Sequence, residues 1–197
     1  KAMSWPTINP VICYLDEQYR QSDKDFLQVL NDIRSSRITQ NTVDILRARH
    51  NADVDDWVVP TKLFTHNRDV DTINQAMLDE ISEQPRTFYM SAEGNDKVVD
   101  MSKNGCLAPE ELSIKTGAMV MFVKNNFQKG YVNGTLGEVI KYSENGYPIV
   151  RTLSGEKIEA APEHWMIEEN GQLQADISQV PLRLAWAITV HKSQGMS

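Results

Sequence analysis

The feature that most constrains the fold is the stretch from Ala118 to Met166, in which no helical periodicity occurs. Short apolar segments alternate there with tight glycine turns, at Asn133-Gly134, Asn145-Gly146 and Ser154-Gly155. Several short strands joined by such turns are typical of a small barrel or sandwich. The sequence therefore predicts a compact β unit in the second half of the chain.

The segments before this β unit indicate strands that alternate with helices. Short apolar strands are expected at Val11–Leu15 and Thr61–Thr65, and Ser22 and Thr39 stand where two helices would begin. A third helix is predicted by an apolar stripe at helical spacing, which Pro85 ends. The stripe consists of Val70, Ile73, Met77, Leu78 and Ile81. This alternation favours an α/β layer with a parallel sheet.

Beyond Pro85 we expect a strand at Phe88–Ala92 and then a polar link to about Lys103. The run from Pro181 to Thr189 is continuously apolar in character, as in a buried parallel strand. The predicted fold is therefore α/β, with a parallel-sheet domain interrupted by a small β domain. The expected boundaries are residues 1–86 and 181–197 for the first domain and residues 87–180 for the insertion.

Composition narrows the functional classes. The net charge of −7 is unlike that of a typical stand-alone nucleic-acid binder, although a local basic groove remains compatible with it. Two distant cysteines, Cys13 and Cys106, fit a reducing compartment, and four scattered histidines give no metal-site spacing. No apolar run reaches the roughly 18 residues of a membrane span. A cytoplasmic protein without a membrane segment or metal site is expected.

The main candidate site follows the predicted last strand, at Thr189–Gly195. In open α/β sheets, ligands bind beyond the carboxyl ends of the strands. Hydroxyl, imidazole, ammonium and amide groups gathered there can bind a phosphate backbone without reading its sequence. A polar loop that merely caps a helix through Ser193 explains the same residues equally well.

Two other strand-to-helix junctions carry similar groups. Tyr19 can stack on a base, and Arg20 can reach an anion at a helix N-terminus, although an Arg20–Asp23 surface pair is the commoner arrangement. At the second junction, His66 and Asn67 can contact a ligand. The alternative is that Asn67 or Asp69 only caps the helix that follows.

A fourth candidate is the amide-rich basic loop in the β unit. It contains Lys124, Asn125, Asn126, Lys129, Tyr131 and Asn133. Cations with an aromatic residue suit single-stranded nucleic acid, and a solvated hairpin loop is the alternative.

Three blocks in order resemble the C-terminal half of a superfamily 1 DNA helicase of the Pif/RecD-like branch. L-A-W-A-I-T-V-H-K-S-Q-G is similar to motif V of that branch, and D-E-Q-Y-R-Q-S-D followed by F-L-Q-V-L-N-D-I-R to its motif IV region. G-A-M-V-M-F-V-K-N with V-N-G-T-L-G-E-V resembles the start of its inserted SH3-like barrel. The resemblance implies a partial RecA-like parallel sheet interrupted by an SH3-like β-barrel.

The resemblance also implies roles for the matching residues. Tyr19 would lie against adenine, and Arg20 would contact the γ-phosphate as an arginine finger. Gln194 and Gly195 would face the nucleotide cleft. The expected contacts to single-stranded DNA are Thr189, His191, Lys192, Ser193, His66, Asn67, Lys124, Asn125 and Lys129.

The sequence departs from a complete helicase in one respect that matters for activity. It contains no G-x-x-x-x-G-K-[ST] motif, and Mg²⁺–ATP in this family binds mainly to the first RecA-like domain. We therefore expect a C-terminal fragment of an ATP-dependent helicase that hydrolyses no ATP alone. The family resemblance implies 5′-to-3′ polarity. Its partners would be single-stranded DNA and the missing N-terminal RecA-like domain. The alternative function is a non-catalytic module that binds nucleic acid or protein.

Overall fold

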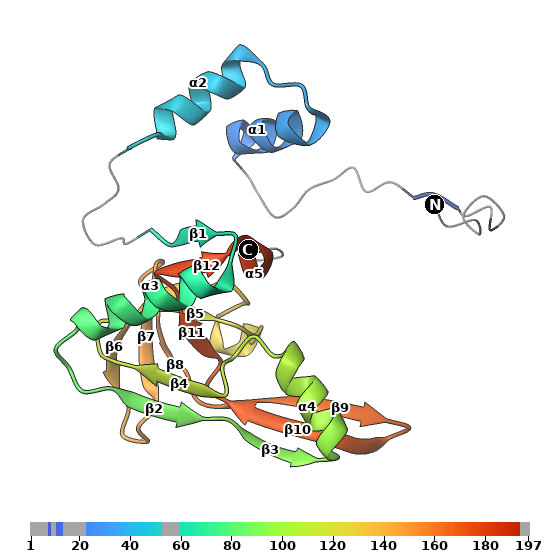
Figure 1. Ribbon diagram of the computed structural model, residues 1–197, viewed down its shortest axis with the longest axis vertical. Helices are drawn as coiled ribbons and strands as arrows, with labels where there is room; N and C mark the ends of the chain where they lie inside the picture. The colour runs from blue at the N-terminus through green and yellow to red at the C-terminus, as the bar shows by residue number, and fades with distance from the viewer. Residues whose placement is uncertain (1–7, 9–10, 14–22, 53–59, 194–197) are drawn as a thin grey trace. The chain divides into compact units, whose positions relative to one another are not determined.

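The computed structural model describes residues 8, 11–13, 23–52 and 60–193 (Figure 1). The chain divides into two compact units, residues 1–53 and residues 54–197. None of the helices in the described ranges combines the length and apolar character that a membrane-spanning helix requires.

The first unit contains helices α1 (Lys24–Ser35) and α2 (Gln40–Arg49). Asp23 caps α1, because its carboxylate accepts hydrogen bonds from the backbone N–H groups of the first turn. The predicted cap, Ser22, lies outside the described residues. Thr39 caps α2 as predicted, through a reciprocal capping box with Thr42.

In the second unit, β1 (Lys62–Phe64) and β12 (Ala187–Thr189) form a parallel pair, and α3 (Asn67–Glu80) packs against β12. The apolar stripe predicted for α3 is confirmed, since Val70 and Leu78 are buried. Met77 and Ile81 pack against the same core. This helix therefore joins the parallel pair to the hydrophobic core of the unit.

The strands of the predicted β unit form one antiparallel sheet in the order β11-β5-β6-β7-β8, in which β11 comes from beyond the predicted boundary at residue 180. Closure of this sheet into a barrel or sandwich stays a prediction. The strands are β5 (Met119–Phe122), β6 (Leu136–Tyr142), β7 (Pro148–Thr152), β8 (Lys157–Glu159) and β11 (Leu182–Leu184). Gly134, Gly146 and Gly155 each have positive φ, as the turns between these strands require. Side chains of this sheet share one hydrophobic core with α3. In this core the rings of Phe122 and Tyr131 stack with centroids 4.1 Å apart.

The rest of the second unit was predicted less well. A three-stranded antiparallel sheet has the order β3-β10-β9, and β2 pairs with β4. These strands are β2 (Arg86–Tyr89), β3 (Ser91–Gly94), β4 (Glu111–Ile114), β9 (Glu163–Glu169) and β10 (Gln172–Gln179). A short 3-10 helix, η1 (Phe127–Lys129), lies between β5 and β6.

Helix α4 (Asp96–Gly105) replaces the polar link that the sequence predicted to run to about Lys103. Asn95 caps this helix by accepting a hydrogen bond from the backbone N–H of Lys97. None of its residues is fully buried, and its only apolar residues, Val98, Val99 and Met101, lie within one turn, which is too short a stretch to show a repeating helical period.

The prediction of one continuous strand from Pro181 to Thr189 is wrong. β11 pairs antiparallel with β5, whereas β12 pairs parallel with β1, and the chain changes sheets at Ala185–Trp186. The N–H of Ala185 still donates to the carbonyl of Met119, at 2.9 Å, and the next carbonyl, of Trp186, accepts from Lys62. The fold is thus mixed α/β as expected, but β1–β12 is the only parallel pair among the described strands.

Candidate nucleic-acid interface

The parallel pairing of β1 and β12 brings two of the predicted segments to one edge of the sheet. Phe64 lies opposite Thr189 in the register, so both strands end at the same level. Residues 65–67 lead from β1 into α3, and residues 190–193 form a single helical turn, α5 (Val190–Ser193), directly after β12. We call residues 65–67 and 189–193 together the sheet edge.

Buried hydrogen bonds hold β12 in this position. The side chain of Asn74, on α3, donates to the carbonyl of Ala187 at 2.9 Å and accepts from its N–H at 3.0 Å. Directly before β1, the hydroxyl of Thr61 donates to the carbonyl of Ala185 at 2.8 Å. Asn74 therefore takes the place of a neighbouring strand for this residue, which satisfies two buried backbone groups.

The turn after β12 is stabilised from within. Thr189 is only 3% exposed, and its hydroxyl accepts a hydrogen bond from the N–H of Lys192 at 3.4 Å. The hydroxyl of Ser193 donates to the carbonyl of Val190 at 2.7 Å. The alternative that this segment caps a helix is therefore partly correct, with Thr189 as the capping residue in place of Ser193. The imidazole of His191 remains exposed on this turn.

On the β1 side, His66 occupies the N-cap position of α3 but makes no capping hydrogen bond with its side chain. Its Nδ1 lies 2.8 Å from the hydroxyl of Thr65. The prediction that Asn67 or Asp69 caps this helix is wrong, because both lie inside its first turn. His66 and Asn67 are exposed, so the sheet edge presents two imidazoles and an amide to solvent.

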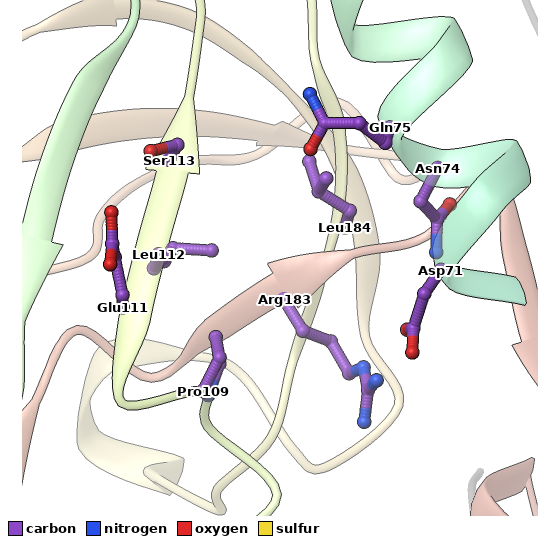
Figure 2. Close-up of a pocket in the computed structure, with 9 residues that line it drawn as sticks. All are labelled: Asp71, Asn74, Gln75, Pro109, Glu111, Leu112, Ser113, Arg183 and Leu184. Atoms are coloured by element: carbon purple, nitrogen blue, oxygen red, sulfur yellow. The ribbon is translucent and has the colours of Figure 1, made fainter. Parts of the chain in front are cut away.

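Sequence reasoning missed Arg183, on β11. Its guanidinium borders a cavity of about 360 Å³, whose other lining residues include Asp71, Asn74 and Ser113 (Figure 2). Burial lowers the pKa of Arg183, and the charge of Asp71 opposes that effect. The pKa of Lys192 is likewise lowered, first by burial and then by the charge of Arg183. A lone arginine inside an otherwise apolar run was the signal in the sequence.

The basic loop of the β unit, residues 124–133, is folded onto β9. Lys124 donates to the carbonyl of His164 and lies over the ring of Trp165, with Nζ 4.9 Å from the centroid. The amide oxygen of Asn125 accepts from the N–H of Asn133 at 2.7 Å. Of the three predicted DNA contacts in this loop, these two already have partners within the protein.

Lys129 is the third, and it joins a cluster centred on Glu163. The oxygen Oε1 of Glu163 accepts from Lys129 at 2.7 Å, from Asn126 at 2.8 Å and from the hydroxyl of Tyr131 at 2.9 Å. Burial raises the pKa of Glu163, but these three hydrogen bonds outweigh burial and lower the pKa overall. Burial raises the pKa of Tyr131, the hydrogen bond and charge of Glu163 raise it further, and Asn126 opposes these effects. Glu163, on β9, therefore largely balances the charge of Lys129.

The residues expected to face a nucleotide are Tyr19, Arg20, Gln194 and Gly195, and all four lie outside the described residues. The structure therefore places the predicted DNA-contacting residues and leaves the nucleotide contacts as predictions.

Comparison with known proteins gives consistent matches. A family model described as the 2B domain of the DNA helicase Pif1 matches residues 101–142, from α4 to the end of β6. The chain is 32% identical over 255 residues to the ATP-dependent DNA helicase Pif1 of Psychrobacter sp., covering all of this chain and 38% of that protein. It is 32% identical over 201 residues to the ATP-dependent DNA helicase PIF1 of Homo sapiens, covering all of this chain and 31% of that protein. It thus spans about a third of the length of these curated relatives.

Solved structures agree with the sequence matches. Pif1 from Bacteroides sp. in complex with ADP-AlF4 matches with a TM-score of 0.76 and 28% identity, covering 92% of this chain and 43% of that chain. Bacteroides Pif1 in complex with ADP-AlF3 and ssDNA matches with a TM-score of 0.57 and 29% identity, over 92% of this chain and 43% of that chain. The mixed α/β fold described above is therefore the fold of the corresponding part of these helicases.

Proposed function

The chain belongs to the Pif1-like superfamily 1 helicases, and we propose that it supplies part of the single-stranded DNA track of an ATP-dependent, 5′-to-3′ DNA helicase. The observation that carries the proposal is the parallel pairing of β1 with β12. It gathers His66 and Asn67 with His191 and Lys192 at the carboxyl end of both strands, where open α/β sheets bind ligands.

The sheet edge offers groups that suit a single strand. An exposed imidazole, as at His191 and His66, can stack on any base without selecting a sequence. The amide of Asn67 and the ammonium of Lys192 can donate to phosphate oxygens. Thr189 and Ser193 use their hydroxyl groups within the turn, so their part in the proposal is to hold His191 and Lys192 in place.

The proposal also assigns the domains. Residues 1–86 and 181–197 would be the second RecA-like domain, and residues 87–180 its SH3-like insertion. The parallel pair β1–β12 with α3 supports the first assignment, and strands β5 to β8 with their glycine turns support the second, although β11, at residues 182–184, pairs with β5. A cytoplasmic location is part of the same proposal, because two cysteines far apart in the sequence, Cys13 and Cys106, fit a reducing compartment.

ATP and Mg²⁺ would be bound by the complete helicase, mainly by its other RecA-like domain. Tyr19, Arg20, Gln194 and Gly195 would complete the nucleotide site from this chain, with Arg20 as the arginine finger. In a polypeptide that also contains the first RecA-like domain, Arg20→Ala should lower the DNA-stimulated ATPase rate on the order of 10³-fold. An unchanged rate would refute this role of Arg20.

Direct binding tests the DNA track. Anisotropy of a fluorescein-labelled single-stranded oligonucleotide should show binding that weakens as salt rises, because phosphate contacts release counterions. His191→Ala should weaken binding about tenfold, which corresponds to the loss of one stacked base. His50→Ala is the matched control, since His50 is an exposed histidine at the end of α2. Equal affinities of the two variants would argue against the sheet edge.

A further inference from the structure

Strand β9 forms an open border of the three-stranded sheet β3-β10-β9 (Figure 1). β10 pairs with one side of it, and no strand in the described ranges pairs with the other side. The backbone groups of successive strand residues point to opposite sides. The carbonyl of His164 accepts a hydrogen bond from Lys124, which belongs to the basic loop and not to this sheet, so the backbone groups of His164 point away from β10. By the same alternation, those of Met166 and Glu168 also point outward.

The hydrogen bonds on the far side of β10 agree with this orientation. The N–H of Asn95, directly after β3, donates to the carbonyl of Gln174 at 2.8 Å, so the backbone groups of Gln174 and Asp176 face β3. Between them, Ala175 faces β9, where its partner is Ile167. Ile167 therefore uses its backbone groups within the sheet, and the residue on each side of it directs its own groups outward.

A groove lies along this open border. A cavity of about 540 Å³ is lined by residues of α4, by β9 and by the start of the basic loop. Its apolar side chains include Met101, which is 65% exposed, and the half-buried Trp165 and Ile167. Free backbone groups beside apolar pockets are the arrangement that binds an extended peptide as an added strand, with alternate side chains in the pockets.

Charges along β9 define the ends of the added strand. At the His164 end, Lys124 is the only lysine, arginine or carboxylate among the residues that line the groove, and two of its three N–H donors remain after its bond to a carbonyl. At the other end, Glu168 and Glu169 are exposed and form no ion pair within the described ranges. Antiparallel pairing is the more stable arrangement. An antiparallel segment therefore fits best with a basic N-terminal end and an acidic C-terminal end.

We propose that β9 and the groove beside α4 bind an extended segment of a partner protein, which adds a strand antiparallel to β9. The segment has apolar side chains at alternate positions, a basic residue at its N-terminal end and a carboxylate at its C-terminal end. This surface uses none of the residues of the sheet edge, and the inference goes beyond the proposed function.

Two other occupants fit this surface less well. Pairing of β9 with the β9 of a second copy about Met166 would place Glu163 opposite Glu169, and like charges directly opposite each other are destabilising. A DNA strand would place its phosphates near the exposed Glu168 and Glu169, which repel them. It would also leave the outward N–H and C=O groups of β9 without the alternating partners that a peptide supplies.

The test is the fluorescence anisotropy of a labelled peptide, Lys-Thr-Val-Thr-Phe-Thr-Val-Asp, with the 197-residue chain. Binding should saturate, and exchanging the Lys and Asp ends should weaken it about tenfold, because both charge pairs become repulsive. N-methylation of every second amide should abolish binding in one register and leave it unchanged in the other, because only one edge of the peptide faces β9.

Variants of the chain locate the bound peptide. Met166→Pro removes an N–H that points away from β10, so it should weaken peptide binding at least tenfold while the urea midpoint changes little. Met101→Gln should weaken binding about fivefold through lost apolar contact, and Lys124→Gln about threefold. Leu153→Gln and Lys157→Gln are the matched controls, since Leu153 is an exposed apolar residue after β7 and Lys157 an exposed lysine on β8.

Four outcomes would overturn the inference. Equal binding of the two N-methylated peptides would reduce the interaction to apolar contact without strand addition, and this comparison decides even if Met166→Pro unfolds the chain. A dimer in sedimentation velocity that Met166→Pro converts to a monomer would make a second copy the occupant. If Met101→Gln and Lys124→Gln weaken binding of a single-stranded oligonucleotide but not of the peptide, the groove belongs to the DNA track. Absence of peptide binding up to about 1 mM would refute the docking surface itself.

Discussion

The sheet edge and the basic loop at residues 124–133 contain similar polar and cationic side chains. Those of the loop contact other groups of the protein, whereas the imidazoles and the amide of the sheet edge are exposed. In the loop, Lys124 and Lys129 already contact a carbonyl, an indole ring and a carboxylate. At the sheet edge, His66 and His191 are exposed, and Arg183 on β11 has a buried nitrogen with no hydrogen-bond partner among the described residues. Sequence composition gives the two regions equal claims to bind DNA, whereas their internal contacts distinguish a folded support from an open binding surface.

The two regions also differ in what maintains them. The sheet edge depends on the amide of Asn74, which satisfies both backbone groups of Ala187, 113 residues away in the chain. The loop depends on a carboxylate, Glu163, that accepts hydrogen bonds from three donors. Removing each anchor in turn therefore separates stability from DNA binding.

The largest effect is expected at Asn74. Asn74→Ala leaves the buried N–H and C=O of Ala187 without partners and should lower the free energy of unfolding by about 3 kcal/mol. Urea denaturation followed by circular dichroism measures this loss. Gln75→Ala is the control, because Gln75 is exposed on the same helix and bonds only to exposed Asp79. A loss below about 1 kcal/mol for Asn74→Ala would mean that water replaces the amide.

Removing Glu163, which anchors the loop, should lower the free energy of unfolding by a smaller amount. Glu163→Ala removes the acceptor shared by Lys129, Asn126 and Tyr131 and should lower the free energy of unfolding by about 2 kcal/mol, since the carboxylate is 15% exposed and water can reach part of the cluster. Glu168→Ala, at an exposed position on the same strand, is the control. Affinity for a single-stranded oligonucleotide should not fall. A fall in affinity equal to that of His191→Ala would make the loop the principal track.

The charge of Glu163 gives a pH dependence with a definite sign. Its pKa in the folded protein is lowered, so its ion pair stabilises the fold above the ordinary pKa of a glutamate, and that stability is lost as pH falls through the folded pKa. Glu163→Gln keeps an acceptor oxygen but no charge. The difference in unfolding free energy between the native chain and this variant should therefore shrink from pH 7 to below about pH 4. A difference that stays constant across this range would show that the hydrogen bonds, without the charge, stabilise the loop.

Local features of the fold were predictable from the sequence. The glycine turns and the stripe on α3 appear where expected, because each depends on residues near in sequence. The exchange of sheets at Ala185–Trp186 was not predictable. It depends on backbone partners at Met119 and Lys62, which no periodicity within the run records.

The candidate site shows the same division. The location of His66 and His191 at the same end of the sheet follows from placing two strands in one parallel sheet, which the sequence predicted. The pairing of Lys129 with Glu163 could not be predicted in this way, because Glu163 lies 34 residues further along the chain. Arg183 was overlooked for a related reason, since only the folded cavity shows that a charge in an apolar run lacks a partner.

The smallest expected effect discriminates most directly between the two regions. Lys129→Gln should change the affinity for single-stranded DNA by no more than about twofold, since the charge of Lys129 is already balanced by Glu163 at 2.7 Å. Lys157→Gln, at an exposed position on β8, corrects for the general loss of one positive charge. Fluorescence anisotropy at several salt concentrations compares both variants with His191→Ala. If Lys129→Gln weakens binding tenfold and reduces the salt slope while Lys157→Gln does not, Lys129 leaves Glu163 for a phosphate when DNA binds, and the loop is then a second open surface.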